Sequence, residues 1–272
     1  MWKTEQRDPA TRHIDTAPTA EMVALLQRAN EQAAAAVGAV SAEITAAIDA
    51  VAGRMVQGGR LFYVGCGTSG RLGVLDASEC PPTFGVAPSL VQGLIAGGDR
   101  ALRCAVEGAE DDAAAGAADL AACQPNRLDT VVGLSAAGGA RYVLGALRQA
   151  GQAGCLTVAV TCNRDSALAG LAQLAICPDT GAEPITGSTR MKAGTAQKMI
   201  LNMLSTGVMI RLGKVMENLM VNVQPTNEKL RGRCIRIVQE LAPCTAQQAQ
   251  EALLKANWDI RRAVETLGGS AH

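Results

Sequence analysis

The sequence predicts an α/β protein with a doubly wound, mostly parallel five-stranded sheet, N-terminal helices before it and a C-terminal helical appendage after it. Three observations predict this class. Five short apolar, β-branched runs recur along the middle of the chain, helix-length segments separate them, and three shorter helical patterns close the chain. Short strands that alternate with helices are typical of parallel sheets covered on both faces. Ligands of such sheets bind beyond the carboxyl ends of the strands.

The elements follow in order. Residues 1–58 hold an extended arm with Pro9 and Pro18, then two Ala-rich amphipathic helices within 21–57. The sheet domain is expected at 59–222, with strands at 61–64, 90–95, 130–134, 156–161 and 174–177. A long helix at 188–212, which Ser and Thr hydroxyls can cap, has apolar residues on more than one face and is expected to be buried or at an interface. The appendage, 223–272, is expected to hold helices near 227–241, 245–255 and 257–267.

Composition excludes several function classes. The chain has 25 Lys plus Arg against 25 Asp plus Glu and only six aromatic residues, so we expect no nucleic-acid partner. The two histidines, His13 and His272, leave no basis for a histidine-dependent hydrolase or metal site. Nine cysteines without a C-x-x-C pair predict neither zinc nor a disulfide framework, and favour a reducing cytosol. No signal peptide and no 18-residue uncharged apolar run is visible, so a cytoplasmic protein without a membrane partner is expected.

A glycine-rich loop follows the first strand. It reads GCGTSGR at 65–71, which has the G-x-G-x-x-G spacing of dinucleotide sites. Such sites also need an acid at the end of the second strand, but position 90 is Leu90 and the first later acid is Asp99. The hydroxyls of Thr68 and Ser69, beside amides at a helix N-terminus, instead favour a compact phosphate monoester. A plain structural glycine turn is the remaining alternative.

A second loop, TGSTRMKAGT at 186–195, opens the long helix and supplies hydroxyls, amides and two cations. The alternative is an ordinary capped helix with solvated charges. Two loops of this kind in one sheet protein favour a phosphorylated small molecule as the ligand.

Carboxylates are the expected acid–base groups. Asp76 and Glu79 stand three apart on one helix face, and the string EGAEDD at 107–112 follows the second strand. A carboxylate that is partly desolvated near a phosphate can act as a general acid or base. Most acidic pairs on helices are solvated surface charges, so spacing alone does not choose between these roles.

Three long strings resemble one family. They are GRLFYVGCGTSGRLGVLDASECPPTFG, IAGGDRALRCAVEGAEDD and TGSTRMKAGTAQKMILNMLSTGVMIRLGKVMENLMVNVQPTNEKL. With EQRDPAT near the N-terminus, they resemble the N-acetylmuramic acid 6-phosphate etherases, which have a sugar-isomerase (SIS), flavodoxin-like fold. The related glucokinase regulatory proteins carry two such domains, more than 272 residues accommodate. The segment NWDIRRAV at 257–264 resembles a small ubiquitin-associated-like unit, for which we expect a role in dimer packing.

The resemblance implies a cytoplasmic, homodimeric carbon–oxygen lyase of peptidoglycan recycling and amino sugar (carbohydrate) metabolism. It would cleave the D-lactyl ether of N-acetylmuramic acid 6-phosphate to N-acetylglucosamine 6-phosphate and D-lactate, by elimination and then hydration, with no cofactor and no metal. The family's two catalytic glutamates match Glu79 and Glu110 of this chain. The resemblance therefore implies that Glu79 protonates the departing lactyl oxygen and that Glu110 is the partner acid/base. An elimination of this kind needs an acid and a base but no histidine. The candidate phosphate-binding residues are Gly67, Thr68, Ser69, Gly138, Ser188, Thr189 and Lys192.

One loop departs from the family pattern. After the third strand the family typically has AASGRTPY, whereas this chain has SAAGGARY at 135–142. Ala137 and Ala140 replace two hydroxyls and Gly139 replaces an arginine, which removes about 3 to 6 kcal/mol of phosphate binding. An alternative function is therefore a weakened sugar-phosphate sensor or regulator on the same fold. A third hypothesis, a nucleotide-dependent oxidoreductase, is supported by the glycine spacing alone.

Overall fold

The computed structural model describes residues 2–223, 225 and 227–269, and its contacts divide the chain into two compact units. The first unit holds residues 1–78 and 89–208, and the second holds 79–88 and 209–272. Helices α3 (Gly67–Phe84) and α7 (Lys192–Arg211) each run from one unit into the other. The domain boundaries expected at 58/59 and 222/223 stay a prediction.

A five-stranded parallel sheet forms the centre of the first unit, which confirms the predicted fold class. Its order is β2-β1-β3-β4-β5, and every neighbouring pair is parallel. All residues of β1, β3 and β4 are buried, as continuous apolar runs require when helices cover both faces. The strands lie within two residues of the predicted bounds, and they are β1 (Leu61–Gly65), β2 (Val91–Ile95), β3 (Thr130–Leu134), β4 (Leu156–Val160) and β5 (Leu174–Ile176).

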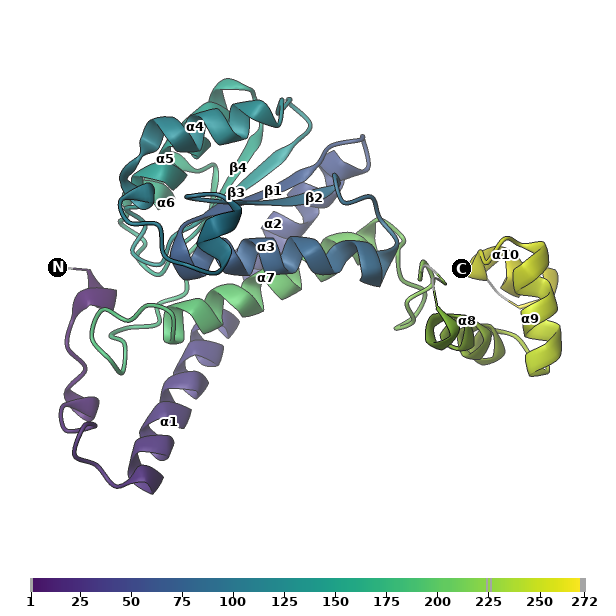
Figure 1. Cartoon of the computed structure of the whole chain (residues 1–272), viewed down its shortest axis with the longest axis horizontal. Coiled ribbons are helices and arrows are strands. Elements are labelled where there is room, and N and C mark those ends of the chain that lie inside the picture. The colour runs from purple at the N-terminus through teal and green to yellow at the C-terminus, as the bar shows by residue number, and fades with distance from the viewer. Residues whose placement is uncertain (1, 224, 226, 270–272) are drawn as a thin grey trace. The chain divides into compact units, whose positions relative to one another are not determined.

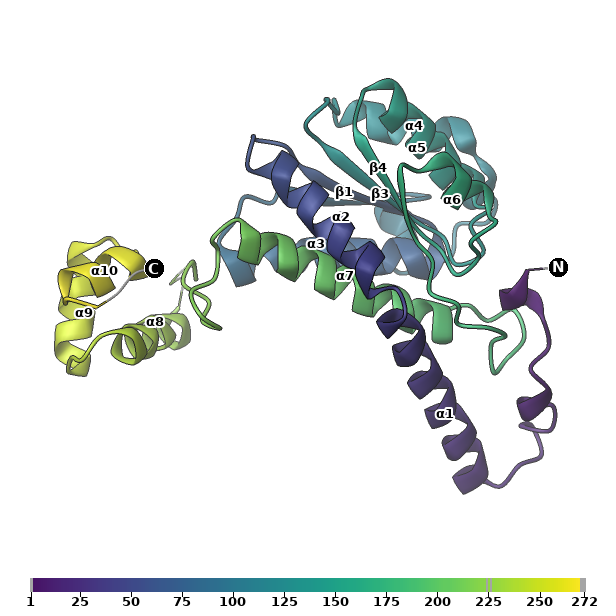
Figure 2. The ribbon, with the colours of Figure 1, turned by 180° about the vertical axis from the view of Figure 1, so that it is seen from behind.

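Helices cover both faces of this sheet (Figure 1). On one face lie α4 (Ala113–Ala122), α5 (Arg141–Gln152) and α6 (Ala167–Leu171). On the other lie α2 (Ser41–Met55) and the parts of α3 and α7 that belong to the first unit, and the view from behind shows the same division (Figure 2). The chain therefore winds in both directions from the centre of the sheet.

The N-terminal segment differs partly from expectation. The predicted pair of helices is confirmed as α1 (Thr19–Gly38) and α2, but the arm before them is not simply extended. It contains two short 3₁₀ turns, η1 (Lys3–Glu5) and η2 (Pro9–Thr11), the second capped by the carboxylate of Asp8. In the described part of the chain no single helix is long and apolar enough to cross a membrane. The bent pair α1–α2, taken together, has the length and composition of a membrane span.

Among the described residues, the nine cysteines form no disulfide.

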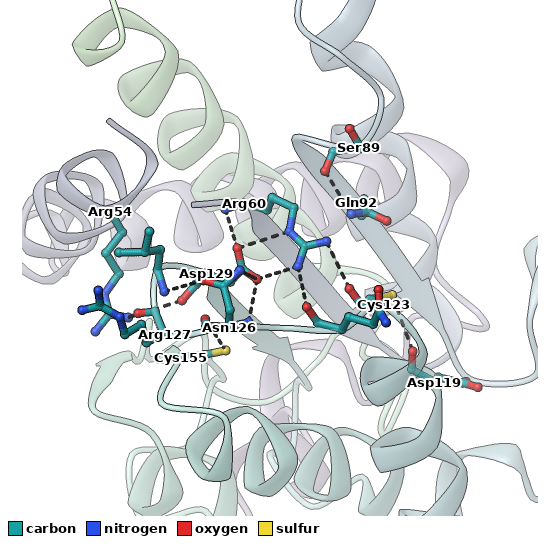
Figure 3. A network of polar contacts seen from close by, with 12 residues as sticks. Arg54, Arg60, Ser89, Gln92, Asp119, Cys123, Asn126, Arg127, Asp129 and Cys155 are labelled. Carbon is teal, nitrogen blue, oxygen red and sulfur yellow. Dashed lines mark hydrogen bonds and ion pairs between the residues drawn. The ribbon is translucent and has the colours of Figure 1, made fainter. Parts of the chain in front are cut away.

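A buried carboxylate fixes the amino end of the sheet (Figure 3). Asp129, fully buried just before β3, accepts hydrogen bonds from Arg60 N at 2.8 Å and Arg60 Nη2 at 2.7 Å, and from Asn126 N at 2.9 Å. Arg60 directly precedes β1 and also donates to the carbonyl oxygens of Cys123 and Gln124. The Asp129 carbonyl in turn accepts from Leu156 N at the start of β4. One side chain thereby sets where β1 and β3 begin.

The described chain after residue 222 is helical, as predicted. It forms α8 (Glu228–Leu241), α9 (Ala246–Lys255) and α10 (Ile260–Thr266), and a reciprocal capping box between Thr245 and Gln248 begins α9. Their apolar faces meet in one core that includes Cys234, Val238 and Leu253. The apolar residues that recur along these three helices therefore pack against one another in a core of their own.

Replacing Asp129 should destabilise the sheet strongly. In Asp129→Ala the Arg60 guanidinium loses its buried partner, so we expect the free energy of unfolding to fall by about 3 to 5 kcal/mol. Urea unfolding followed by circular dichroism measures the change. The control is Asp15→Ala, an exposed acid in the arm, for which about 0.5 kcal/mol or less is expected. A loss as small as the control's would show that Asp129 does not fix the sheet.

Candidate active site

A pocket of about 420 Å³ lies beyond the carboxyl ends of β1 and β3. Two loops form most of its wall, residues 66–69 after β1 and residues 135–137, 139 and 140 after β3, whereas the predicted phosphate-binding residue Gly138 does not line it. Glu110 and Thr189 complete it together with Asp111 and Glu5. All of these residues belong to the first unit. Strand order 2-1-3-4-5 changes its winding direction between β1 and β3, which is where such sheets open a crevice for ligands.

The first wall is the N-terminal turn of α3. Gly67, at φ +50°, begins this helix, and the first-turn amides of a helix have no intrahelical partner. A side chain at Gly70 would place its Cβ 2.6 Å from Ile95 Cγ1 and 2.7 Å from the Gly65 carbonyl oxygen, so this glycine lets the helix approach the sheet. The glycine spacing thus serves close helix–strand packing, and the free amides suit an anion.

The two hydroxyls of this turn have different surroundings. Ser69 is 9% exposed and its Oγ donates to Gln197 Oε1 of α7 at 2.8 Å, so its proton is committed inside the protein. Thr68 is half-buried and lines the pocket. Of the two predicted anchors, Thr68 therefore presents the uncommitted hydroxyl, whereas Ser69 joins α3 to α7 beneath the pocket.

The second wall is the loop after β3. Gly138 has φ +76°, and its N–H donates to Ser135 Oγ at 3.1 Å. Asn163 Nδ2 donates to the Ala136 carbonyl oxygen at 3.2 Å and to that of Ala137 at 3.3 Å. These bonds hold the loop through its carbonyl groups. Within the described chain the N–H groups of Ala137 and Gly139 donate to no protein acceptor, and Ala140 is the N-cap of α5 without a side-chain cap.

The pocket therefore collects unpaired backbone donors from the N-terminal turn of α3 and from the loop that leads into α5. Helix N-termini carry partial positive charge and bind phosphate groups readily. The hydroxyls missing at Ala137 and Ala140 leave this backbone arrangement in place, since both alanines line the pocket at the expected turn.

The predicted carboxylates fall in different surroundings. Glu110 lies in a 3₁₀ turn, η4 (Ala109–Asp111), and lines the pocket. Glu79 is exposed on α3, in the second unit. Asp76 is only 5% exposed and accepts from Ser205 Oγ of α7 at 3.2 Å, so it serves packing between α3 and α7. Despite their spacing, Asp76 and Glu79 do not share an exposed face.

Cys66 shows the electrostatic character of the pocket. Burial raises the pKa of its thiol to about 12, and the negative charges of Glu110 and Asp111 add to the effect. The thiol stays protonated at neutral pH and supplies no thiolate. Among the described residues, no group of three or more His, Cys, Asp or Glu side chains is placed to hold a metal ion.

The loop that opens α7 is held differently from expectation. The first helical amides, of Lys192 and Ala193, donate to the carboxylate of Glu183 at 2.8 and 2.9 Å, so this buried acid caps the helix instead of a hydroxyl. Thr189 lines the pocket and Ser188 stands beside it in the chain. Lys192 Nζ donates to Gln32 Oε1 at 3.0 Å and lines a separate pocket beside α1.

Sequence reasoning missed three residues here. Glu183 caps α7, Asn163 holds the loop after β3, and Glu5 reaches the pocket from the arm. None of them stands in a periodic pattern or follows its strand directly. Glu5 belongs to the EQRDPAT string that carries part of the resemblance, which is the one signal that could have found it.

Comparison with solved structures supports the fold alone. An Escherichia coli CFT073 protein, solved as a ligand complex, has a TM-score of 0.52 and 16% identity, and covers 74% of this chain and 96% of its own. A phosphoheptose isomerase from Francisella tularensis has a TM-score of 0.53 and 16% identity, with 71% and 98% covered.

Sequence comparison identifies the family. Residues 43–151 match the glucokinase regulatory protein N-terminal SIS domain, and residues 217–269 match the C-terminal lid domain of glucokinase regulatory protein. The N-acetylmuramic acid 6-phosphate etherase of Pasteurella multocida is 52% identical over 97% of this chain and 88% of its own length. That of Serratia proteamaculans is 53% identical over 96% and 88%. Because relatives of this similarity span nearly the whole chain, the chain belongs to the N-acetylmuramic acid 6-phosphate etherase family.

Proposed function

We propose that the protein is a carbon–oxygen lyase that releases D-lactate from N-acetylmuramic acid 6-phosphate, leaving N-acetylglucosamine 6-phosphate. It would act in the cytoplasm, in the recycling of cell-wall amino sugars. The observation that carries the proposal is the pocket between β1 and β3, where unpaired amides and Glu110 meet in a chain 52% identical to a named etherase.

The phosphate is proposed to bind the N-terminal turn of α3 and the loop that leads into α5. The amides of residues 67–69 and of Ala137 and Gly139 supply donors, and Thr68 adds a hydroxyl. Charge-assisted hydrogen bonds to an anion are roughly twice as strong as neutral ones, so several amides can hold a phosphate without a cation. Anchoring remote from the reacting carbons fixes the sugar against the acid–base groups.

The proposed chemistry is an elimination followed by a hydration. A base takes the C2 proton of the open-chain sugar, the C–H electron pair forms the C2–C3 double bond, and the C3–O bond breaks. The family resemblance gives the protonation of the departing lactyl oxygen to Glu79, which does not line this pocket, and the role of partner acid/base to Glu110, which does and would deliver water to C3 of the unsaturated aldehyde. Cys66 is no candidate for the base, because its pKa of about 12 keeps it protonated.

A homodimer is part of the proposal. It rests on the family resemblance. The exposed apolar side chains of the first unit, such as Val23, Leu75 and Met203, stand on three different helices, and single exposed apolar residues are ordinary on a protein surface.

The second candidate function is a sugar-phosphate sensor that binds without turnover. The observation that favours it is the loop after β3, where Ala137 and Ala140 leave the pocket without two hydroxyls. Binding with no D-lactate release by the folded protein would select this function.

Release of D-lactate tests the lyase directly. Incubation with N-acetylmuramic acid 6-phosphate should yield D-lactate, and Glu110→Gln and Glu79→Gln should each slow it by about 10²-fold or more while ligand binding persists. The control Glu21→Gln, an exposed acid on α1 that does not line the pocket, should stay within about threefold. No release by the folded wild type, beside an active homologue, would reject the function.

The loop after β3 should tolerate an added methyl group at Gly139 but not at Gly138. In Gly138→Ala the new Cβ would lie 2.3 Å from Ser166 Oγ and 2.7 Å from Thr161 Oγ1, at a backbone φ of +76°, so the loop must move. We expect KM to rise about tenfold or more. Gly139→Ala meets no protein atom within 4 Å, so the loop keeps its position and KM should rise less than in Gly138→Ala. Equal KM values for the two variants would show that the loop does not bind substrate.

Restoring the missing hydroxyls should improve binding. Ala137 and Ala140 both line the pocket, so Ala137→Ser with Ala140→Thr should lower KM by about tenfold or more, since each hydroxyl can donate to the phosphate. Thermal unfolding separates this effect from a better N-cap on α5. Ala121→Ser, on the exposed side of α4, is the control. An unchanged KM in the double variant would place the phosphate elsewhere.

A further inference from the structure

The N-terminal arm brings a third carboxylate into the pocket. Glu5, the last residue of the turn η1, lines the pocket together with Glu110 and Thr189. Its Oε2 lies 3.5 Å from the position that a Cβ on Gly187 would occupy, so the side chain reaches the loop that opens α7. Neither the predicted phosphate anchors nor the two carried-over catalytic glutamates include this residue.

The arm is fastened beside the loop after β3. Thr4 is fully buried, and its Oγ1 accepts from Asn163 Nδ2 at 3.4 Å. The same nitrogen donates to the carbonyl oxygens of Ala136 and Ala137, so one amide holds both the arm and the loop. Lys3, on the other side of Thr4, forms an ion pair with Asp179 after β5. Glu5 is thus positioned by its neighbours in the chain.

The chemistry of a carboxylate limits what Glu5 can recognise. An ionised carboxylate only accepts hydrogen bonds, and a phosphate also presents mainly acceptors and negative charge, so the two groups repel each other. The remaining polar groups of an N-acetylated sugar phosphate include hydroxyls and an amide N–H, which can donate. The backbone amides of the pocket suit the anion, and Glu5 suits these donors.

We infer that Glu5 is a substrate-binding residue that accepts a hydrogen bond from a hydroxyl or the amide N–H of the sugar, so that the site selects a sugar phosphate over bare phosphate. The inference rests on the proposed function for the identity of the sugar. It adds to that function a specificity-determining residue on the arm.

Calorimetric titration with two probes tests the inference. Wild type, Glu5→Ala and Glu5→Gln are titrated with N-acetylglucosamine 6-phosphate and with inorganic phosphate. Glu5→Ala should bind the sugar phosphate about tenfold or more weakly, and Glu5→Gln, which keeps a neutral acceptor, should fall between. Both variants should bind inorganic phosphate as well as wild type or more tightly, because a negative charge has left the pocket.

The matched control is Glu21→Ala, an exposed acid on α1 outside the pocket, which should bind both probes like wild type. Unchanged binding of the sugar phosphate by Glu5→Ala, or an equal loss for both probes, would overturn the inference, the second result indicating that the arm merely folds the loop. A wild type that binds neither probe overturns it as well. D-lactate release is measured on the same wild-type sample, so a protein that binds the sugar phosphate without releasing lactate rejects the lyase and still decides the role of Glu5.

Discussion

The site depends on one topological constraint, the reversal of winding between β1 and β3. These strands are hydrogen-bonded neighbours at the centre of the order β2-β1-β3-β4-β5, yet the chain leaves them toward opposite faces, through α3 after β1 and α5 after β3. The two connecting loops must diverge, and the space between them cannot be filled by either. Two helix N-termini therefore open into one pocket.

The two ends of the sheet use polar groups in opposite ways. At the amino end, Asp129 accepts hydrogen bonds from Arg60 and Asn126, so a buried charge is fully satisfied and fixes the strands. At the carboxyl end, the loop after β3 is held through its carbonyl groups by Asn163, which leaves its amides free. Rigid support at one edge and unsatisfied donors at the other is what a preorganised anion site requires.

Local pattern predicted the elements well because burial decides them. Runs such as 130–134 are apolar on both faces and become central parallel strands wherever helices cover them. The site was only partly predictable, because its remaining contacts join segments far apart in sequence. Lys192 looked like a phosphate ligand from its neighbours in the chain, yet Gln32, 160 residues earlier, accepts from its ammonium. Asp76 and Glu79 share a helix face by spacing, but α7 covers only Asp76. Glu183 and Glu5 carry no local signal for where the fold brings them.

The claim that most needs testing is that backbone amides between β1 and β3 hold the phosphate despite the altered loop. A crystal structure with N-acetylglucosamine 6-phosphate tests it most directly. We expect the phosphate within hydrogen-bond distance of the amides of residues 67–69 and of Ala137 and Gly139, with the sugar beside Glu110. A phosphate bound instead at Lys192, in the pocket beside α1, would contradict it.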